Sequence, residues 1–369
     1  MFVSFEGPEG AGKSTAVAGA VSYTHLDVYK RQGIMGLCTA RELLNRGHDV
    51  TLFEQFRPGN LYGSSSGRTR IVRQAYPDQF YTEILLEGHP MWHDLEHELG
   101  RKLIHEVGLL SIGRHDSDEI VHELEALDNL RVPHRVLTSA DVRTVCPQMA
   151  LDTDEIAVMT LSAGWADVSA VLKGLSDSVR SKGAELVEAK VTDLTALDGY
   201  DRVVLTAGAW VTKFLDLDLR VTLQTVVYLD FETQGPVWID YSQPMLYGFP
   251  SEPGSATTKV GYHPPGPETD PESVDRIPQA EAEALMMSRA DRRFPGGHGR
   301  QNVVESAACL YTVARSEDFQ IGWADRRVLF ASPCSGHGFK FGPWIGRLIA
   351  RLLLEEEVLS QWPRFACLR

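Results

Sequence analysis

Residues 33–54, GIMGLCTARELLNRGHDVTLFE, hold the pattern that decides the fold. Gly33 and Gly36 open a segment whose apolar side chains recur on one side of a helix, and Gly47 ends that helix. The apolar run VTLF then indicates a buried parallel strand, and Glu54 closes it. The N-terminus of such a helix can face a pyrophosphate, and a carboxylate at the end of the next strand can hydrogen-bond a ribose. The pattern predicts a Rossmann-like α/β domain that binds an adenine dinucleotide.

The composition of the whole chain excludes several other classes of protein. The 369 residues have a formal net charge of −14, so no overall field favours nucleic acid or an anionic membrane. No run approaches the roughly 18 to 20 apolar residues of a membrane span. Five cysteines are few and odd in number, which favours a reducing compartment, and we expect a cytoplasmic protein. The length fits two domains.

A second phosphate-binding signal lies so close to the first that the two cannot both belong to complete nucleotide-binding units. Residues 1–15, MFVSFEGPEGAGKST, combine a short apolar strand with a P-loop ending in Lys13 and Ser14, and the wording resembles bacterial thymidylate kinases. Residues 21–32, VSYTHLDVYKRQ, back-translate to nearly self-complementary DNA that resembles two head-to-head sequencing adapters. We therefore interpret residues 1–32 as a chimeric, non-native segment with an idle P-loop; a natural linker is the alternative. One consequence is that Arg31 stands where a dinucleotide-binding motif has its first glycine.

Several motifs after residue 54 make the remainder of the chain resemble one family. They are GSSSGRTRIVRQAY at 63–76, LYGFPS at 246–251, TKVGYH at 258–263, AACLYT at 307–312 and PCSGHGFKF at 333–341. Residues 33–369 resemble the FAD-dependent amine oxidases that include monomeric sarcosine oxidase, N-methyltryptophan oxidase and pipecolate oxidase. The resemblance implies oxidation of a secondary amino acid, N-methylated or cyclic, to an imine, with O₂ reduced to H₂O₂ by a monomeric enzyme. A flavin-dependent dehydrogenase that avoids O₂ and a non-functional chimera remain the alternatives.

The resemblance assigns cofactor roles that the bare residues leave open. Arg70 could belong to a solvated basic loop and Cys309 could be an inert buried thiol, but the family pattern places Arg70 against the flavin ring and makes Cys309 its covalent anchor. Lys259 matches a lysine that promotes the reaction with O₂. The other residues expected to contact FAD are Gly33, Gly36, Glu54, Ser65, Ser66, Val191, Gly208, Gly336, His337 and Gly338. Val191 is expected in a short strand, and residues 203–210, VVLTAGAW, in a strand that ends at Gly208.

The same resemblance assigns the substrate side. It implies that Arg73 and Lys340 bind the substrate carboxylate, a task that suits the planar fork of an arginine. Tyr247, His263 and Tyr311 are expected to line the substrate pocket. Without the resemblance, Lys340 would be a surface lysine and His263 a core histidine. No group of residues indicates a metal site.

These assignments predict two interleaved domains. We expect the FAD-binding domain at residues 33–80, 150–215 and 305–369. An α+β substrate domain built on an antiparallel sheet is expected at residues 81–149 and 216–304. Residues 117–128 and 279–293 indicate charged amphipathic helices with solvated polar faces.

Overall fold

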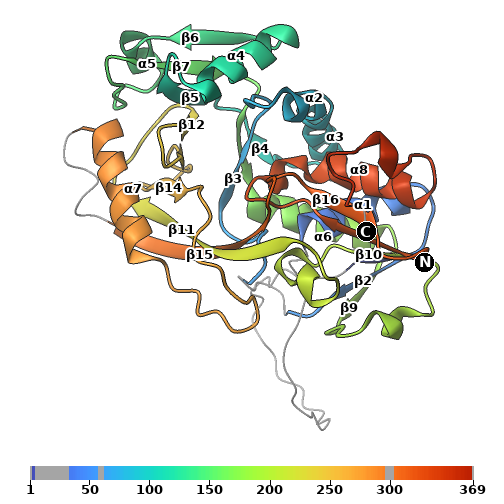
Figure 1. Cartoon of the computed structure of the whole chain (residues 1–369). Coiled ribbons are helices and arrows are strands. Elements are labelled where there is room, and N and C mark those ends of the chain that lie inside the picture. Colours follow the sequence, from blue (N-terminus) through green and yellow to red (C-terminus); the bar gives the residue numbers. More distant parts are fainter. Residues whose placement is uncertain (1, 5–32, 57–61, 296–302, 368–369) are drawn as a thin grey trace.

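The computed structural model describes residues 2–4, 33–56, 62–295 and 303–367. These residues form a mixed α/β fold with two large sheets, as predicted (Figure 1). In the view of Figure 1 the larger sheet lies on the left, and the smaller sheet lies on the right with helices α1, α6 and α8. No helix in the described ranges is long and apolar enough to cross a membrane.

The smaller sheet has six strands in the order β16-β17-β10-β1-β2-β9. All neighbouring pairs are parallel except β16 with β17. Such a sheet is buried on both faces, and helices from distant parts of the chain cover it. Its strands are β1 (Phe2–Ser4), β2 (Val50–Glu54), β9 (Glu185–Glu188), β10 (Val203–Leu205), β16 (Gln320–Trp323) and β17 (Val328–Ser332), and its helices are α1 (Ile34–Asn45), α6 (Val168–Ser181) and α8 (Gly342–Leu353).

The helix predicted from the opening pattern is α1. Gly33 is its N-cap, and Gly47 follows it with φ of +81°, a conformation that glycine adopts at no steric cost. Helix α8 packs closely on α1, because a Cβ atom at Gly346 would lie 2.6 Å from the backbone of Cys38. The predicted helix–strand unit of α1 and β2 is therefore confirmed.

The first strand of the smaller sheet comes from the N-terminal segment. Strand β1 lies between β2 and β10, and its register pairs Phe2 with Val50 and Ser4 with Val204. A strand was predicted at residues 2–5, but as part of an idle P-loop fragment. The P-loop residues Lys13 and Ser14, and the adapter-like residues 21–32, lie outside the described residues.

The larger sheet has eight strands in the order β15-β11-β14-β13-β12-β5-β7-β6. All of its neighbouring pairs are antiparallel except β12 with β5. Its strands are β5 (Leu109–Arg114), β6 (His134–Leu137), β7 (Glu155–Thr160), β11 (Leu219–Leu229), β12 (Val237–Asp240), β13 (Leu246–Phe249), β14 (Thr258–Tyr262) and β15 (Val303–Ala314). Strand β7 and most of β15 belong to this sheet, although residues 155–160 and 305–314 fall in ranges predicted for the FAD-binding domain. The domain boundaries stay a prediction.

Helices α4 (Asp118–Asn129) and α7 (Ala280–Arg293) form where amphipathic helices were predicted, but each buries a charge. Glu123 of α4 and Arg293 of α7 have no exposed surface, so the expectation that their charged faces are solvated is wrong for these two residues. Their partners come from segments far away in the sequence, which a local pattern does not show.

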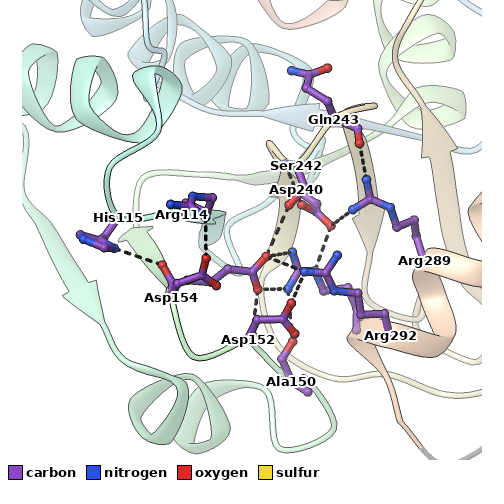
Figure 2. Close-up of polar contacts among 12 residues, drawn as sticks. Arg114, His115, Ala150, Asp152, Asp154, Asp240, Ser242, Gln243, Arg289 and Arg292 are labelled. Carbon is purple, nitrogen blue, oxygen red and sulfur yellow. Dashed lines mark hydrogen bonds and ion pairs between the residues drawn. The ribbon is translucent and has the colours of Figure 1, made fainter.

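The charge on Arg293 is compensated by acidic residues of two strands. Its guanidinium donates to Glu155 Oε1 at 2.8 Å and to Asp240 Oδ2 at 2.9 Å. Burial would raise the pKa of Glu155, but the hydrogen bonds from Arg293 and the Asp152 amide, together with the charges of Arg293 and Arg292, lower that pKa to about 2. Figure 2 shows the surrounding contacts, in which Arg289 and Arg292 extend the cluster toward the surface. The cluster fixes α7 against β7 and β12.

A small sheet and several short helices complete the fold. Strands β3 (Thr69–Val72) and β4 (Ile104–His105) both pair antiparallel with β8 (Gly164–Asp167), so part of the arginine-rich motif at 63–76 is a strand rather than a loop. The remaining elements are α2 (Gln79–Gly88), α3 (Pro90–Leu99), α5 (Ser139–Val145) and the short 3₁₀ helices η1 (Leu194–Leu197), η2 (Gly208–Lys213), η3 (Gly338–Phe341) and η4 (Leu359–Gln361).

Candidate active site

A cavity of about 880 Å³ brings most of the predicted site residues together. Its wall extends from the start of α1, through β3, to strands β14 and β15 and the η3 segment. The predicted residues that line it are Ser65, Ser66, Arg70, Arg73, Gly208, Tyr247, Lys259, His263, Cys309, Tyr311, Gly336, His337, Gly338 and Lys340. Motifs that lie far apart in the sequence, from Ile34 to Lys340, therefore share one cavity.

Four predicted cofactor residues do not line this cavity: Gly33, Gly36, Glu54 and Val191. Gly33 and Gly36 shape the start of α1, where the Ile34 amide donates to Ser65 Oγ at 3.2 Å. Glu54 ends β2 and is buried, and its Oε1 accepts from the Phe56 amide. Their roles stay predictions.

The strand predicted around Val191 is wrong, because this residue lies between β9 and η1 in no strand. Its buried side chain packs with Leu197 and Val203. Likewise, β10 ends at Leu205, before Gly208, and Gly208 begins η2. The sequence could not show these ends, since a valine-rich run extends a strand pattern beyond its hydrogen-bonded part.

Arg70 is held by backbone carbonyl groups. Its guanidinium donates to the oxygens of Thr69 at 2.9 Å, Ser64 at 2.9 Å and Ser66 at 2.5 Å. These bonds satisfy three of its five N–H groups without a carboxylate partner. The positive charge is thus fixed in the cavity wall, and within the described part of the chain no acid forms an ion pair with it.

Lys259 lies on β14 with almost no exposed surface. Its Nζ donates to Thr69 O at 2.9 Å and lies 4.5 Å from the centre of the Phe249 ring. Burial and the nearby Arg70 guanidinium lower the pKa of Lys259 to about 7. The lysine therefore changes charge near neutral pH.

Arg73 and Lys340 converge on Tyr76 from different elements. The Arg73 guanidinium lies 3.8 Å from the centre of the Tyr76 ring, and Lys340 Nζ donates to the Tyr76 hydroxyl at 3.0 Å. Burial, Arg73 and Arg70 lower the pKa of Lys340 well below its usual value. Two buried basic side chains, with no acid bonded to Lys340 Nζ among the residues that the structure describes, offer a site for an anion.

Sequence reasoning missed the residues that hold Arg73. Arg73 Nη1 donates to the Tyr241 hydroxyl at 3.1 Å, and this hydroxyl donates to Glu123 Oε2 at 2.7 Å. Burial raises the pKa of Glu123, and the charge of Arg73 partly offsets that rise. No motif or spacing links these three residues. The only sequence signal was a glutamate at a buried position of a helix, flanked by Ile120 and Leu127 at helical spacing.

Three aromatic side chains close the cavity around these cations. The His263 and Tyr311 rings have centres 6.2 Å apart, and Tyr247 lies on the neighbouring strand β13. Burial, Arg73 and Lys340 lower the pKa of His263 to about 4, so its imidazole is neutral at neutral pH. Tyr247, His263 and Tyr311 therefore give this part of the cavity an aromatic wall, and Arg73 and Lys340 line the same cavity.

Cys309 and the glycine-rich turn form the wall beside Arg70. Cys309 lies on β15 and its thiol has a pKa raised by burial, an effect that Arg70 and Lys259 partly oppose. Gly336 has φ of +77°, and a Cβ there would lie 2.5 Å from the Tyr311 ring. Only glycine permits this approach of the turn to the pocket.

Comparison with known proteins identifies the family. The model of the "FAD dependent oxidoreductase" family matches residues 32–352. The chain belongs to this family of FAD-dependent oxidoreductases. It is 29% identical to human peroxisomal sarcosine oxidase, over 88% of this chain and 90% of the relative. It is also 29% identical to monomeric sarcosine oxidase of Streptomyces avermitilis, over 87% and 91% of the two chains.

Solved structures share the fold. NikD, described as an unusual amino acid oxidase of nikkomycin biosynthesis, has a TM-score of 0.80 at 23% identity, with 99% of this chain and 96% of NikD covered. L-proline dehydrogenase from P. horikoshii has a TM-score of 0.78 at 18% identity, covering 97% and 94%. The predicted fold class and the assignment to FAD-dependent oxidoreductases are thus confirmed.

The cavity wall fits FAD at its flavin end. The cavity extends from Ile34 and Met35, at the electropositive start of α1, to Cys309 and Lys259. A volume of about 880 Å³ lies within the range of small-molecule sites. Phosphate oxygens suit the start of α1, and the fixed charge of Arg70 suits an electron-rich ring.

Proposed function

We propose that this enzyme oxidises a secondary amino acid, N-methylated or cyclic, to an imine and passes the electrons to O₂, which gives H₂O₂. The observation that carries the proposal is the pair of buried basic side chains, Arg73 and Lys340, in the same cavity as Lys259 and Arg70. Arg73 and Lys340 suit the carboxylate of an amino acid, and Lys259 and Arg70 line the same cavity as the glycine turn expected to contact the cofactor. The names of the sarcosine oxidase relatives support the same class of substrate.

In this proposal the side chains of the cavity orient the substrate and stabilise the charges of the reaction. Arg73 would bind the carboxylate bidentately, with Lys340 as its second partner. Neutral His263 and the aromatic rings of Tyr247 and Tyr311 would surround the amine and keep it uncharged by excluding water. FAD, when bound there, would supply the acceptor for a hydride equivalent from the C–H bond next to nitrogen. Lys259 would then stabilise the negative charge that develops as O₂ accepts electrons.

A substrate panel tests the proposal. The purified enzyme is supplied with sarcosine, N-methyl-L-tryptophan, L-pipecolate and L-proline, and H₂O₂ is measured with a peroxidase-coupled dye. We expect turnover with at least one of them, and loss of turnover when the carboxylate of that substrate is replaced by an amide. Equal turnover of the amide would contradict the role of Arg73 and Lys340.

We also propose that FAD is bound covalently through Cys309. Its position in the wall and the resemblance of AACLYT to the family motif support this. The wild type is expected to keep its flavin fluorescence in a denaturing gel, and Cys309→Ser to lose it. Cys334→Ser is the matched control, since Cys334 lines the same cavity. Loss of fluorescence in both variants, or in neither, would argue against Cys309 as the anchor.

A dehydrogenase that avoids O₂ is the second candidate. The similarity in fold to an L-proline dehydrogenase keeps it open, because one fold can carry both reactions. The presence of Lys259 favours the oxidase. If an artificial electron acceptor supports turnover in air without H₂O₂ formation, the dehydrogenase is the better assignment.

We further propose that the enzyme acts as a monomer in the cytoplasm. The name of the Streptomyces avermitilis relative, monomeric sarcosine oxidase, supports the first part. Five free cysteines support the second, because they suit a reducing compartment. Light scattering coupled to gel filtration and fractionation of the source cells would test the two parts.

A further inference from the structure

Helix α3 carries two histidines that face one carboxylate. His89 is the N-cap of α3, and His93 lies four positions further on, so the two side chains share one face of the helix. Glu106 follows strand β4, and its Oε1 lies 2.9 Å from His89 Nε2 and 3.5 Å from His93 Nε2. One ligand atom of each residue lies within 4.8 Å of the others. None of the three lines the active-site cavity.

A fourth residue orients His93. Glu96 Oε2 lies 3.2 Å from His93 Nδ1, while Glu96 Oε1 accepts the amides of Leu103 at 2.7 Å and Ile104 at 3.0 Å. The carboxylate is therefore fixed by the backbone and favours the tautomer that carries its proton on Nδ1. In that tautomer His93 Nε2 has a lone pair and lies 3.5 Å from the carboxylate oxygen Oε1 of Glu106. Two acceptors then face each other, an arrangement that a second proton on the imidazole or a metal cation between the two atoms would stabilise.

We propose that His89, His93 and Glu106 bind a divalent transition-metal cation of the Zn²⁺ class. Two imidazoles and one carboxylate are ligands of three-residue zinc sites, which keep a further position for water. Glu96 supplies the outer carboxylate that commonly accepts the second N–H of a metal-bound histidine. The metal would join the start of α3 to the segment after β4.

The surroundings of the two histidines predict an exchangeable ion. His93 and Glu106 are exposed or nearly so, with side-chain exposures of 45% and 35%, so water and chelators reach the site. When Nε2 of His89 binds a metal, Nδ1 must carry the proton, and this buried atom has no hydrogen-bond partner among the described residues. We therefore expect a chelator to remove the metal without unfolding the protein.

Zinc titration tests the site. The full-length, FAD-loaded protein is treated with EDTA, dialysed and titrated with Zn²⁺ in a calorimeter, and bound zinc is measured by elemental analysis. We expect one Zn²⁺ per chain. Each of the variants His93→Ala, Glu106→Gln and Glu96→Gln should bind Zn²⁺ at least about tenfold more weakly than the wild type. Both ligand variants change exposed side chains, so we expect them to fold. Unchanged flavin absorbance would verify this.

The matched control is His97→Ala, which removes an exposed histidine of the same helix. It is expected to bind Zn²⁺ like the wild type. If His97→Ala weakens binding and Glu106→Gln does not, the ion lies between His93 and His97, and the assignment fails. Absence of stoichiometric zinc in the wild type, or equal affinity in His93→Ala, would overturn it as well.

Discussion

At the residue scale, Lys259 gains or loses its proton close to neutral pH. Its pKa of about 7 results from burial and from Arg70, so the cationic form dominates below pH 7 and is lost above it. The ammonium is the form that would stabilise charge on O₂. We expect H₂O₂ formation to fall as the pH rises through 7, while turnover with an artificial acceptor does not show that decrease.

Lys259→Arg is the informative variant for this prediction. Arginine stays charged across the accessible pH range, so the decrease around pH 7 should disappear. Lys259→Met should lower the O₂-dependent rate by about 10²- to 10³-fold, comparable to the loss of one electrostatic stabiliser, and leave substrate oxidation by the artificial acceptor nearly intact. An unchanged O₂-dependent rate in Lys259→Met would refute the role.

Lys340 predicts proton uptake on substrate binding. In the free protein its pKa is well below the usual value because of burial, Arg73 and Arg70. A bound carboxylate favours the charged form of Lys340 and raises its pKa again. At a pH between the pKa of the free protein and that of the complex, Lys340 therefore takes up a proton when the carboxylate binds. The affinity for a carboxylate inhibitor such as acetate should therefore fall as the pH rises through this interval.

Calorimetry in buffers of different ionisation enthalpy measures that proton. We expect a binding enthalpy that depends on the buffer in the wild type and not in Lys340→Met. The variant should also bind the carboxylate at least tenfold more weakly, since a charge-assisted hydrogen bond is removed. Buffer-independent binding in the wild type would show that Lys340 does not change its protonation.

Glu123 is predicted to position Arg73 through the Tyr241 hydroxyl. Glu123→Gln keeps the shape but removes the charge, so the geometry of Arg73 should relax and the KM for an amino acid substrate should rise about tenfold, with a smaller change in kcat. Glu125→Gln, an exposed position on the same helix, is the control and should behave like the wild type. A fall in kcat with unchanged KM would point to a different role.

At the element scale, the helices and strands that could be predicted were those whose own sequence carries a periodic pattern. The unit of α1 and β2 followed from apolar periodicity and glycine positions within 22 residues, and both elements formed there. Strand β3 was not predicted, because its partner β8 lies almost a hundred positions away and its own sequence is rich in arginine. For the site, motifs placed most residues in one cavity, but Tyr241 and Glu123 belong to no motif.

The position of helix α7 depends on the charge of Arg293, which the amphipathic sequence pattern had assigned to the solvent-exposed face. Removal of Arg293 would leave Glu155 and Asp240 buried without their main partner, which costs about 3–5 kcal/mol in comparable buried pairs. We therefore expect Arg293→Ala to lower the free energy of unfolding by roughly that amount in urea denaturation. Arg292→Ala, which removes a half-exposed neighbour, should cost less than about 1 kcal/mol. Equal losses would mean that the cluster does not depend on its buried member.

At the scale of the whole molecule, the two sheets have different functions in the cavity. The larger sheet carries Lys259 and Cys309, while the smaller sheet and its helices supply the start of α1 and the η3 segment with Lys340. The site therefore requires both sheets to form and to lie together. Any weakness at the centre of the smaller sheet is expected to affect cofactor binding before it affects the larger sheet.

Strand β1 is that central element, and it belongs to the segment interpreted as non-native. Val3→Pro should disrupt the sheet, because a proline in a central strand removes a backbone donor between β2 and β10. We expect a loss of about 3 kcal/mol or more in the free energy of unfolding, together with loss of bound flavin. Val3→Ala, which keeps the backbone donor, should retain the flavin. If Val3→Pro retains flavin and stability, residues 2–4 contribute nothing and the foreign segment is idle; if only Val3→Pro loses them, a fragment that resembles a kinase strand has replaced the first strand of a flavoenzyme.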